Sequence, residues 1–491
     1  MVEMGKAKEL EVDQHGIKYI PDEKGAFVPE KSKQKPDSFF LSFSMLSVNL
    51  IAITGASTYS WTSPVIPKLL SNDTDVNPLD SPATTMEISM LAGLPNLTCT
   101  LGIIIAPIIA NILGRKKANQ IFSLAMLFCN TMVAFSSKMV FITIFRSVIM
   151  AGFMGSVASM LLYVAESCET HNRAKYSSFT SLAFPIGDML SFAIGPHFSV
   201  RTFTLLLNIP LILYLISSIF VSESPVFLLS NGLRDKAFKV LLTLRSNKTR
   251  KEVEEEFIEM ENNLKQNQSS KNAGYLSLVK TKEGRKGVAL GIIPMLAQYM
   301  SGAAVIIAFL GPIFDSPGAV LSGDSVALIV GILRIIATYG TISIIEKFNR
   351  KTLLMFSSLG CGFCMSVLGI LFFLNSHKTI SLTTFQLLSI IFIISFIVIF
   401  CLGLAPVPPV MVSEFFPTDL RSVGTSAILT LVSVALYIES AGFPFLNEYA
   451  GTYWCLWVFS LNMLVSSIAI YCFVPETRGK SFSQIQEEIG N

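Results

Sequence analysis

The chain has 491 residues, of which 51% are hydrophobic and only 14% are charged, a balance that excludes an ordinary soluble enzyme. The net charge of +3 says little by itself, and nucleic acid is not an expected partner. Apolar runs of about 20 residues recur, the length that an α-helix needs to cross a hydrocarbon core roughly 30 Å thick. Because a backbone in lipid must satisfy its own hydrogen bonds, we expect an all-α membrane protein embedded in the lipid bilayer.

The first 37 residues are polar and contain no apolar signal segment, so residues 1–37 are predicted to form a tail. After them the apolar runs predict twelve membrane spans, at about 39–60, 87–112, 118–137, 140–164, 176–197, 203–221, 288–313, 325–345, 353–374, 385–412, 423–445 and 452–474.

These spans divide into two six-helix halves, 38–222 and 287–474, followed by a short tail, 475–491. The hydrophilic insert between the halves, 223–286, mixes acidic and basic residues at helical spacing, so we expect amphipathic helices at the membrane surface. A solvated linker without such helices is the alternative.

Basic residues in the short loops predict the orientation, because cytoplasmic loops are enriched in lysine and arginine. Eight basic residues lie on the same side as the insert and both tails, namely Arg115, Lys116, Lys117, Arg173, Lys175, Lys347, Arg350 and Lys351. This side is predicted to be cytoplasmic, so both termini lie inside. Asn72 then starts an Asn-Asp-Thr glycosylation signal in an outer loop, whereas the signal at Asn247 lies inside and stays unmodified.

The two halves repeat one another in sequence. Glu166 and Arg173 follow one apolar run, and Glu414 and Arg421 follow a later one with the same spacing. Glu223-Ser-Pro225 and Pro475-Glu-Thr477 form a further echo. The chain is therefore expected to be one structural unit present twice.

These motifs resemble those of the sugar porters of the major facilitator superfamily, and within them the insect facilitated trehalose transporters. The resemblance covers roughly residues 40–485. The segments that carry it are Gly114-Arg115-Lys116, Arg146 with Tyr163, Glu166 and Arg173, Ser222-Glu-Ser-Pro225, Gln298-Tyr-Met-Ser-Gly302, Glu346-Lys-Phe-Asn-Arg350-Lys, Glu414 with Arg421, and Pro475-Glu-Thr-Arg-Gly-Lys-Ser-Phe482.

The resemblance implies two pseudo-symmetric halves that rock about a binding site at the midplane. It also implies an inner gate whose charges can pair across the halves when the inner mouth is shut, and which would comprise Arg115, Arg146, Glu166, Arg173, Glu346, Arg350, Glu414 and Arg421. A role in topology and loop capping alone is the alternative. The acid that precedes the Gly-Arg-Lys motif in the family is Asn111 here, which removes one gating charge.

The substrate site departs from the family pattern. Gln298 keeps the first amide of the motif in the seventh span, Tyr299 replaces the second, and Ser301 follows. Ser181, Pro409, Val432 and Arg334 stand at the positions of the family's span-five glutamine, span-ten tryptophan, span-eleven asparagine and span-eight amide. We expect Gln298, Tyr299, Ser301 and Ser181 to line the pocket.

Two charges lie deep within apolar spans, Asp188 in the fifth and Arg334 in the eighth. Counted from the cytoplasmic ends at 1.5 Å per residue, they lie at similar depths of about 22 and 18 Å. An unpaired charge in a membrane is unfavourable, so we predict that the two approach each other, with Glu439 as the rival partner of Arg334. The pair would be either part of the substrate site or purely structural.

The resemblance thus implies a facilitative uniporter of a hexose, trehalose or similar sugar at the plasma membrane. Residues 52–64 of the first span contain no acid, whereas the proton-coupled branch of the family carries an aspartate there. No catalytic residue, cofactor or metal site is expected. The alternatives are a transporter of another small solute, such as an organic anion attracted to Arg334, and a transport-inactive nutrient sensor.

Overall fold

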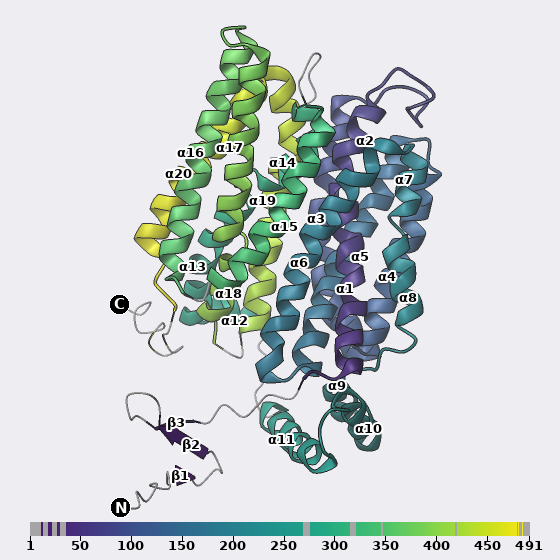
Figure 1. The fold of residues 1–491 in the computed structure, drawn as a ribbon, viewed down its shortest axis with the longest axis vertical. Coiled ribbons are helices and arrows are strands. Elements are labelled where there is room, and N and C mark those ends of the chain that lie inside the picture. The colour runs from purple at the N-terminus through teal and green to yellow at the C-terminus, as the bar shows by residue number, and fades with distance from the viewer. Residues whose placement is uncertain are drawn as a thin grey trace, which may run out of the picture.

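A computed structural model describes residues 11–12, 18–21, 27–29, 36–268, 275–314, 321–344, 347–417, 420–478, 480 and 484. Long helices run side by side in two groups, one from each half of the sequence, and the helices that follow the first group in sequence lie at one end of the bundle (Figure 1). We call this end, where α9 (Pro225–Ser230), α10 (Arg234–Leu244) and α11 (Arg250–Gln268) lie, the linker end, and the opposite end the distal end.

The N-terminal group forms the predicted six spans, and two of them are interrupted. Its helices are α1 (Phe39–Ser60) with α2 (Thr62–Leu69), α3 (Thr85–Leu113), α4 (Arg115–Ala134), α5 (Met139–Ser167), α6 (Thr170–Ile194), the 3₁₀ turn η1 (Gly195–His197), and α7 (Val200–Leu206) with α8 (Ile209–Ser217).

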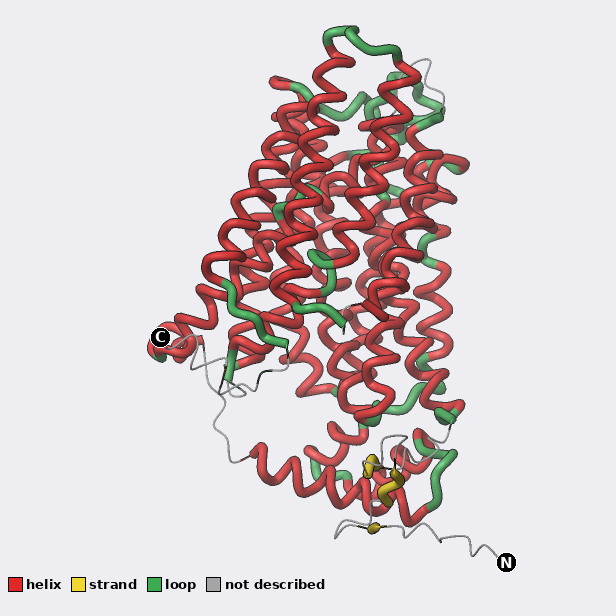
Figure 2. Tube along the Cα trace, turned by 60° about the vertical axis from the view of Figure 1, so that its left-hand side comes forward, coloured by secondary structure: helices red, strands yellow, loops and turns green. Residues whose placement is uncertain are grey.

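The C-terminal group repeats this pattern, with α12 (Tyr275–Lys280) before it. Its helices are α13 (Lys282–Tyr299) with α14 (Ala303–Phe314), α15 (Gly323–Ile344), α16 (Arg350–Ser376), α17 (Leu382–Leu402) with α18 (Val407–Phe415), α19 (Arg421–Ala450) and α20 (Thr452–Phe473). Figure 2 shows that most of the described chain is helix.

Ten of the described helical segments are long and apolar enough to cross a membrane. The two remaining spans of the predicted twelve are α4 and α6, which run the length of the bundle beside their neighbours (Figure 1). These two helices are less apolar because polar residues are frequent in both, among them Lys116, Asn130, Lys175 and Asp188. Asn130 and Asp188 are buried against other helices, whereas Lys116 and Lys175 lie near the linker-end termini of α4 and α6.

The insert between the halves is helical as predicted. Helices α10 and α11 pack through a small apolar core of Ala237, Leu241, Val253 and Phe257. In the tail, three short strands, β1 (Glu11–Val12), β2 (Lys18–Pro21) and β3 (Phe27–Pro29), form an antiparallel sheet in the order β1-β2-β3. The prediction of a plain tail did not include them.

The two halves contact each other mainly through α3 with α19, α6 with α15, and α2 with α14. Close approach is possible because the contacts use small residues. Gly93 of α3 lies so near α19 that an added Cβ would come within 2.6 Å of the Ala441 Cβ. The Ser63 hydroxyl of α2 accepts a hydrogen bond of 3.0 Å from the Gly311 N–H of α14. The bonds that we describe between halves all lie at mid-helix or toward the distal end.

Candidate functional site

A buried ion pair joins the two halves at mid-bundle. Asp188 of α6 pairs with Arg334 of α15, and its other carboxylate oxygen accepts a hydrogen bond from the Ser60 hydroxyl at the end of α1. The Asp188 side chain is 5% exposed and that of Arg334 is 18% exposed. The sequence-based prediction that these two residues meet is confirmed, and Ser60 is a third member that the sequence did not reveal.

The predicted seventh span breaks between α13 and α14, at the motif expected to bind substrate. Gly302 holds the break with a φ of +80°, a conformation that glycine adopts without strain. Ser301 is buried and donates its hydroxyl hydrogen to the Gln298 carbonyl, 2.7 Å away. The Gln298 side-chain amide donates to the Ala405 carbonyl at 3.0 Å, which ties α13 to the break between α17 and α18.

Glu439 of α19 contacts this break. One of its carboxylate oxygens accepts the Gly302 N–H at 3.0 Å, so the residue caps the start of α14 from a neighbouring helix. Its side chain is buried, and it forms none of the ion pairs present in the described chain. Glu439 is therefore not a partner of Arg334, and its place beside the seventh span could not be read from the sequence.

On the other half, Arg146 of α5 is buried, with 3% of its surface exposed. It donates to the Thr58 carbonyl at 3.1 Å, and its guanidinium lies 4.4 Å from the centroid of the Trp61 ring. No carboxylate among the described residues forms an ion pair with it. The resemblance placed Arg146 in the inner gate, but the structure places it deep in the bundle.

Arg146 lines a cavity of about 10 Å³ at the junction of the halves, together with Tyr59, Asn96 and Ser440. The Asn96 amide of α3 donates to the Ser440 hydroxyl of α19 at 3.0 Å. Tyr59 also lies within electrostatic range of Glu439, Asp188 and Tyr299. We define the polar centre as Tyr59, Asn96, Arg146 and Ser440, which line this small space, together with Gln298 and Glu439 at the neighbouring break between α13 and α14.

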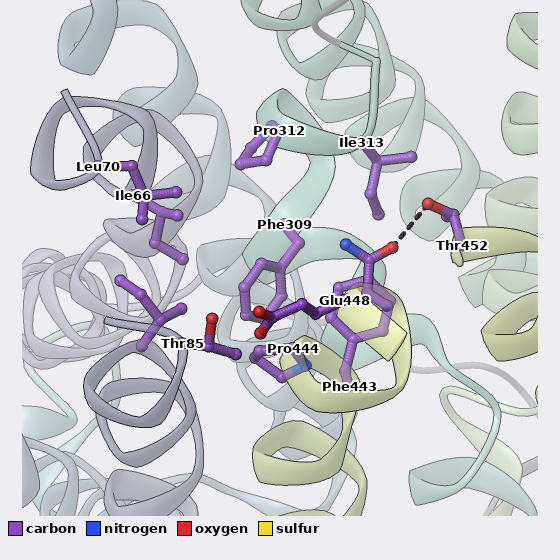
Figure 3. Close-up of a pocket in the computed structure, with 12 residues that line it drawn as sticks. Ile66, Leu70, Thr85, Phe309, Pro312, Ile313, Phe443, Pro444, Glu448 and Thr452 are labelled. Atoms are coloured by element: carbon purple, nitrogen blue, oxygen red, sulfur yellow. Dashed lines mark hydrogen bonds between the residues drawn. The ribbon is translucent and has the colours of Figure 1, made fainter. Parts of the chain in front are cut away.

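A larger cavity of about 210 Å³ lies between the halves at the distal end. Its walls are mostly apolar, and Figure 3 shows Phe309 beside Phe443 with Ile66 on the facing helix. Glu448 and Asn447 add polar groups, and both are exposed. A sugar needs several hydrogen-bonding partners, which the polar centre offers in greater number than this larger space. The 10 Å³ at the polar centre is about the size of one water, so the halves must move apart before a sugar fits there.

At the linker end of the N-terminal half, two predicted gate residues belong to one cluster. Arg115 of α4 forms an ion pair of 2.7 Å with Glu166 of α5, which also accepts the Ser224 hydroxyl at 2.5 Å. The Glu223 carboxylate accepts hydrogen bonds from the backbone N–H groups of Arg115 and Lys116 at 2.9 and 3.0 Å. Its negative charge therefore interacts favourably with the positive end of the α4 dipole.

The C-terminal half repeats this cluster. Arg350 of α16 pairs with Glu414 of α18 and also donates to the Thr477 hydroxyl at 3.3 Å. The Glu476 carboxylate accepts the N–H groups of Arg350 and Lys351 at 3.1 and 3.0 Å. The predicted repeat is thus present in three dimensions, down to the hydrogen bonds.

These clusters do not pair across the halves as predicted, because each cluster joins helices of its own half. Arg173 and Arg421 are exposed, and neither joins an ion pair formed by the described residues. Glu346 lies outside the described residues. Ser181 is exposed on α6, seven positions before Asp188, and its hydroxyl contacts only the Ser177 carbonyl at 3.5 Å within its own helix.

The insert is tied to the N-terminal half by a charged cluster. Arg245, 3% exposed, contacts Glu256 of α11 and Glu169 before α6, each at 2.9 Å, and Lys248 contacts the same two carboxylates. Burial alone would raise the pKa of Glu256, but hydrogen bonds and charge from Arg245 and Lys248 outweigh it and lower the pKa below its ordinary value. Glu256 is therefore anionic near neutral pH.

Comparisons with known proteins agree on one family. The model of the family described as "Sugar (and other) transporter" matches residues 27–489. The facilitated trehalose transporter Tret1 of Apis mellifera ligustica is 25% identical over 446 residues, covering 90% of this chain and 86% of that protein. Sugar transporter ERD6-like 1 of Arabidopsis thaliana is 25% identical over 451 residues, covering 90% and 92%.

The fold also matches a solved structure. The inward open conformation of the xylose transporter XylE from E. coli superposes with a TM-score of 0.75 at 18% identity, covering 92% of this chain and all of that chain. At this identity the likeness establishes the fold, which is that of the major facilitator superfamily.

Proposed function

Because this chain belongs to the sugar (and other) transporter family, we propose that it carries a sugar across the plasma membrane by facilitated diffusion. Members of this family are membrane transporters and not enzymes. Hexoses, trehalose and xylose are the candidate substrates, the last two because similar proteins are named for them. Movement follows the gradient of the sugar, since no acid lies in α1 or α2.

The observation that carries the proposal is the polar centre. A sugar presents hydroxyl groups that both donate and accept, together with an apolar ring face. The centre supplies two amides, a carboxylate, a guanidinium and the Tyr59 ring, from helices of both halves. A substrate bound there contacts both halves at once, so its binding energy can bias their relative position.

Arg334 gives little support to the alternative substrate class, an organic anion. The charge of its guanidinium is balanced by Asp188 within the interface. An anion would have to displace this carboxylate, or leave it without a counterion. We therefore favour a neutral substrate.

In the proposed orientation the linker end is cytoplasmic. The bonds between halves lie at mid-helix and distally, so the halves are closed toward the outside and can separate at the cytoplasmic end. The proposed gate residues Arg115, Glu166, Arg350 and Glu414 keep the cytoplasmic helix ends of each half together, and exposed Arg173 and Arg421 are available to the opposite half when that end closes.

Uptake by the purified protein in liposomes tests the proposal. Radiolabelled glucose, trehalose, xylose and a monocarboxylate would be compared, with protein-free liposomes as the control. We expect saturable uptake of at least one sugar that stops when inside and outside concentrations are equal. Uptake of the monocarboxylate alone would favour the organic-anion alternative, and the absence of any uptake would favour a sensor.

A further inference from the structure

We propose that Glu439 is a substrate-binding residue that accepts a hydrogen bond from one hydroxyl of the transported sugar and thereby selects for that hydroxyl. This inference rests on the proposed function and adds a specificity determinant to it. Neither its position in α19 nor its residue type was part of the predicted pocket.

The geometry leaves one oxygen of this carboxylate for a ligand. The first oxygen accepts the Gly302 N–H at 3.0 Å, which fixes the side chain against the break between α13 and α14. The second oxygen is buried and has no hydrogen-bond partner among the described residues. Only about 9% of the residue is exposed, so bulk water does not compensate for the missing bond.

A purely structural cap would not need this second oxygen. One acceptor is enough to satisfy the Gly302 N–H, and a buried carboxylate oxygen without a donor is unfavourable. Tyr59 of the opposite half lies within electrostatic range of Glu439, and the adjacent Ser440 lines the small cavity of the polar centre. The carboxylate thus lies at the junction of the halves, where a substrate would contact both.

Two further polar atoms of the centre are in the same condition. Arg146 Nε and Gln298 Oε1 are buried without a hydrogen-bond partner in the part of the chain that the structure describes. Arg146 offers a donor, whereas Gln298 and Glu439 offer acceptors. A polyhydroxyl ligand can match such a set because every hydroxyl both donates and accepts. Gln298 in the seventh span and Glu439 in the eleventh therefore select for sugar hydroxyls that donate a hydrogen bond.

The proposed direction of this hydrogen bond, from a sugar hydroxyl to Glu439, can be tested one hydroxyl at a time. The parent sugar is the best substrate among glucose, trehalose and xylose, and its monodeoxy and monofluoro analogues compete for uptake into liposomes. Fluorine accepts a hydrogen bond weakly and cannot donate one, so a carboxylate should reject the fluoro and the deoxy analogue equally. We expect one position at which both analogues bind about tenfold or more weakly than the parent.

The variant Glu439→Gln separates this contact from the cap. Its amide oxygen can still accept the Gly302 N–H, while its amide nitrogen presents donors to the ligand. The preference for hydroxyl over fluorine at that position should therefore fall to near one. Glu448→Gln is the matched control, because this glutamate lies on the same helix but is exposed at the distal cavity. It should leave the analogue profile unchanged.

If Glu439→Gln does not reach the membrane, Glu439→Asp retains the charge and withdraws the carboxylate by one methylene. It should raise the KM for the parent sugar about tenfold, with little effect on the analogue that lacks the selected hydroxyl. A flat analogue profile in the wild type, or a profile that neither variant changes, overturns the role of Glu439 alone. Failure of the wild type to take up any sugar overturns the proposed function instead.

Discussion

Asp188 and Arg334 form a buried ion pair that spans the interface between the two halves of the molecule. The pair also contacts α1 through the Ser60 hydroxyl, so three helices converge on one carboxylate. An isolated charge at this depth would be strongly unfavourable, which is why each residue of the pair depends on the other.

Asp188→Asn should therefore leave Arg334 without a counterion and destabilise the protein by about 3–5 kcal/mol. The double variant Asp188→Asn with Arg334→Gln removes both charges and should recover most of this loss. Chemical denaturation of the purified protein in detergent measures both effects. A single variant as stable as the wild type would contradict the prediction. If substrate competes for the pair, the double variant should fold and yet show altered selectivity.

Glu414→Gln tests the gate at the linker end. The neutral amide loses its attraction to Arg350 and to exposed basic residues of the other half, such as Arg173, so we expect a shift of up to a few kcal/mol toward an open cytoplasmic mouth. The measurement is the rate at which a thiol reagent labels a cysteine introduced at Ser181, which should rise. Unchanged labelling together with normal transport would reduce the cluster to a topology signal.

Uptake should be insensitive to a proton ionophore, and the sugar should not accumulate above its outside concentration. The reason is that α1 and α2 contain no acidic residue. Tracer uptake into energised vesicles, with and without the ionophore, decides the point. Collapse of uptake with the gradient would establish proton coupling, and Asp188 and Glu439 would then be the carboxyl groups to replace.

The attachment of the insert should weaken in acid. Because the folded-state pKa of Glu256 is lowered, its contribution to stability is complete above the ordinary glutamate pKa of about 4.5 and disappears as the pH falls through the lower folded value. Limited proteolysis of the full chain should accordingly cleave α10 and α11 faster below about pH 4.5. Glu256→Gln should cleave faster already at pH 7, whereas Glu255→Gln, an exposed neighbour, should behave as the wild type.

Asn72 should carry a glycan when the protein is made in a secretory pathway that adds N-linked sugars. It is exposed in the connection between α2 and α3 at the distal end, which faces outward in the proposed orientation. An electrophoretic shift on glycosidase treatment that disappears in Asn72→Gln is the expected result. Asn247, whose amide donates to the Pro36 carbonyl at 2.6 Å, serves as the control and should be unmodified. The reverse pattern would invert the orientation.

The spans were predictable because bilayer thickness and hydropathy fix their length. Most ends of the twelve runs coincide with helix ends to within a few residues. The exceptions include α6 and α13, which begin well before their apolar parts, and α2, which extends the first span to Leu69. The meeting of Asp188 with Arg334 was also predictable, since the constant rise of a helix converts sequence position into depth. The motifs indicated that Glu223 after the sixth span and Glu476 after the twelfth are equivalent residues. They did not indicate that these residues cap α4 and α16.

The partners within the site were not predictable, because they depend on how helices from distant parts of the chain rotate about their axes. The bond from Gly302 to Glu439 and that from Asn96 to Ser440 are of this kind. The pairing of Arg115 and Arg350 within their own halves has the same origin. Glu439 was the rival partner for Arg334, and its bond to Gly302 shows that it lies elsewhere.

The two linker-end clusters, each closed within its own half, have a mechanical consequence. If the halves rotate as rigid levers, neither the Arg115–Glu166 pair nor the Arg350–Glu414 pair has to break during the movement. Most of the activation barrier then falls on the few bonds that cross the interface, above all Asp188–Arg334. Substitutions in the clusters should therefore shift the balance between the open and the closed cytoplasmic mouth, whereas substitutions at the interface should chiefly alter the turnover rate.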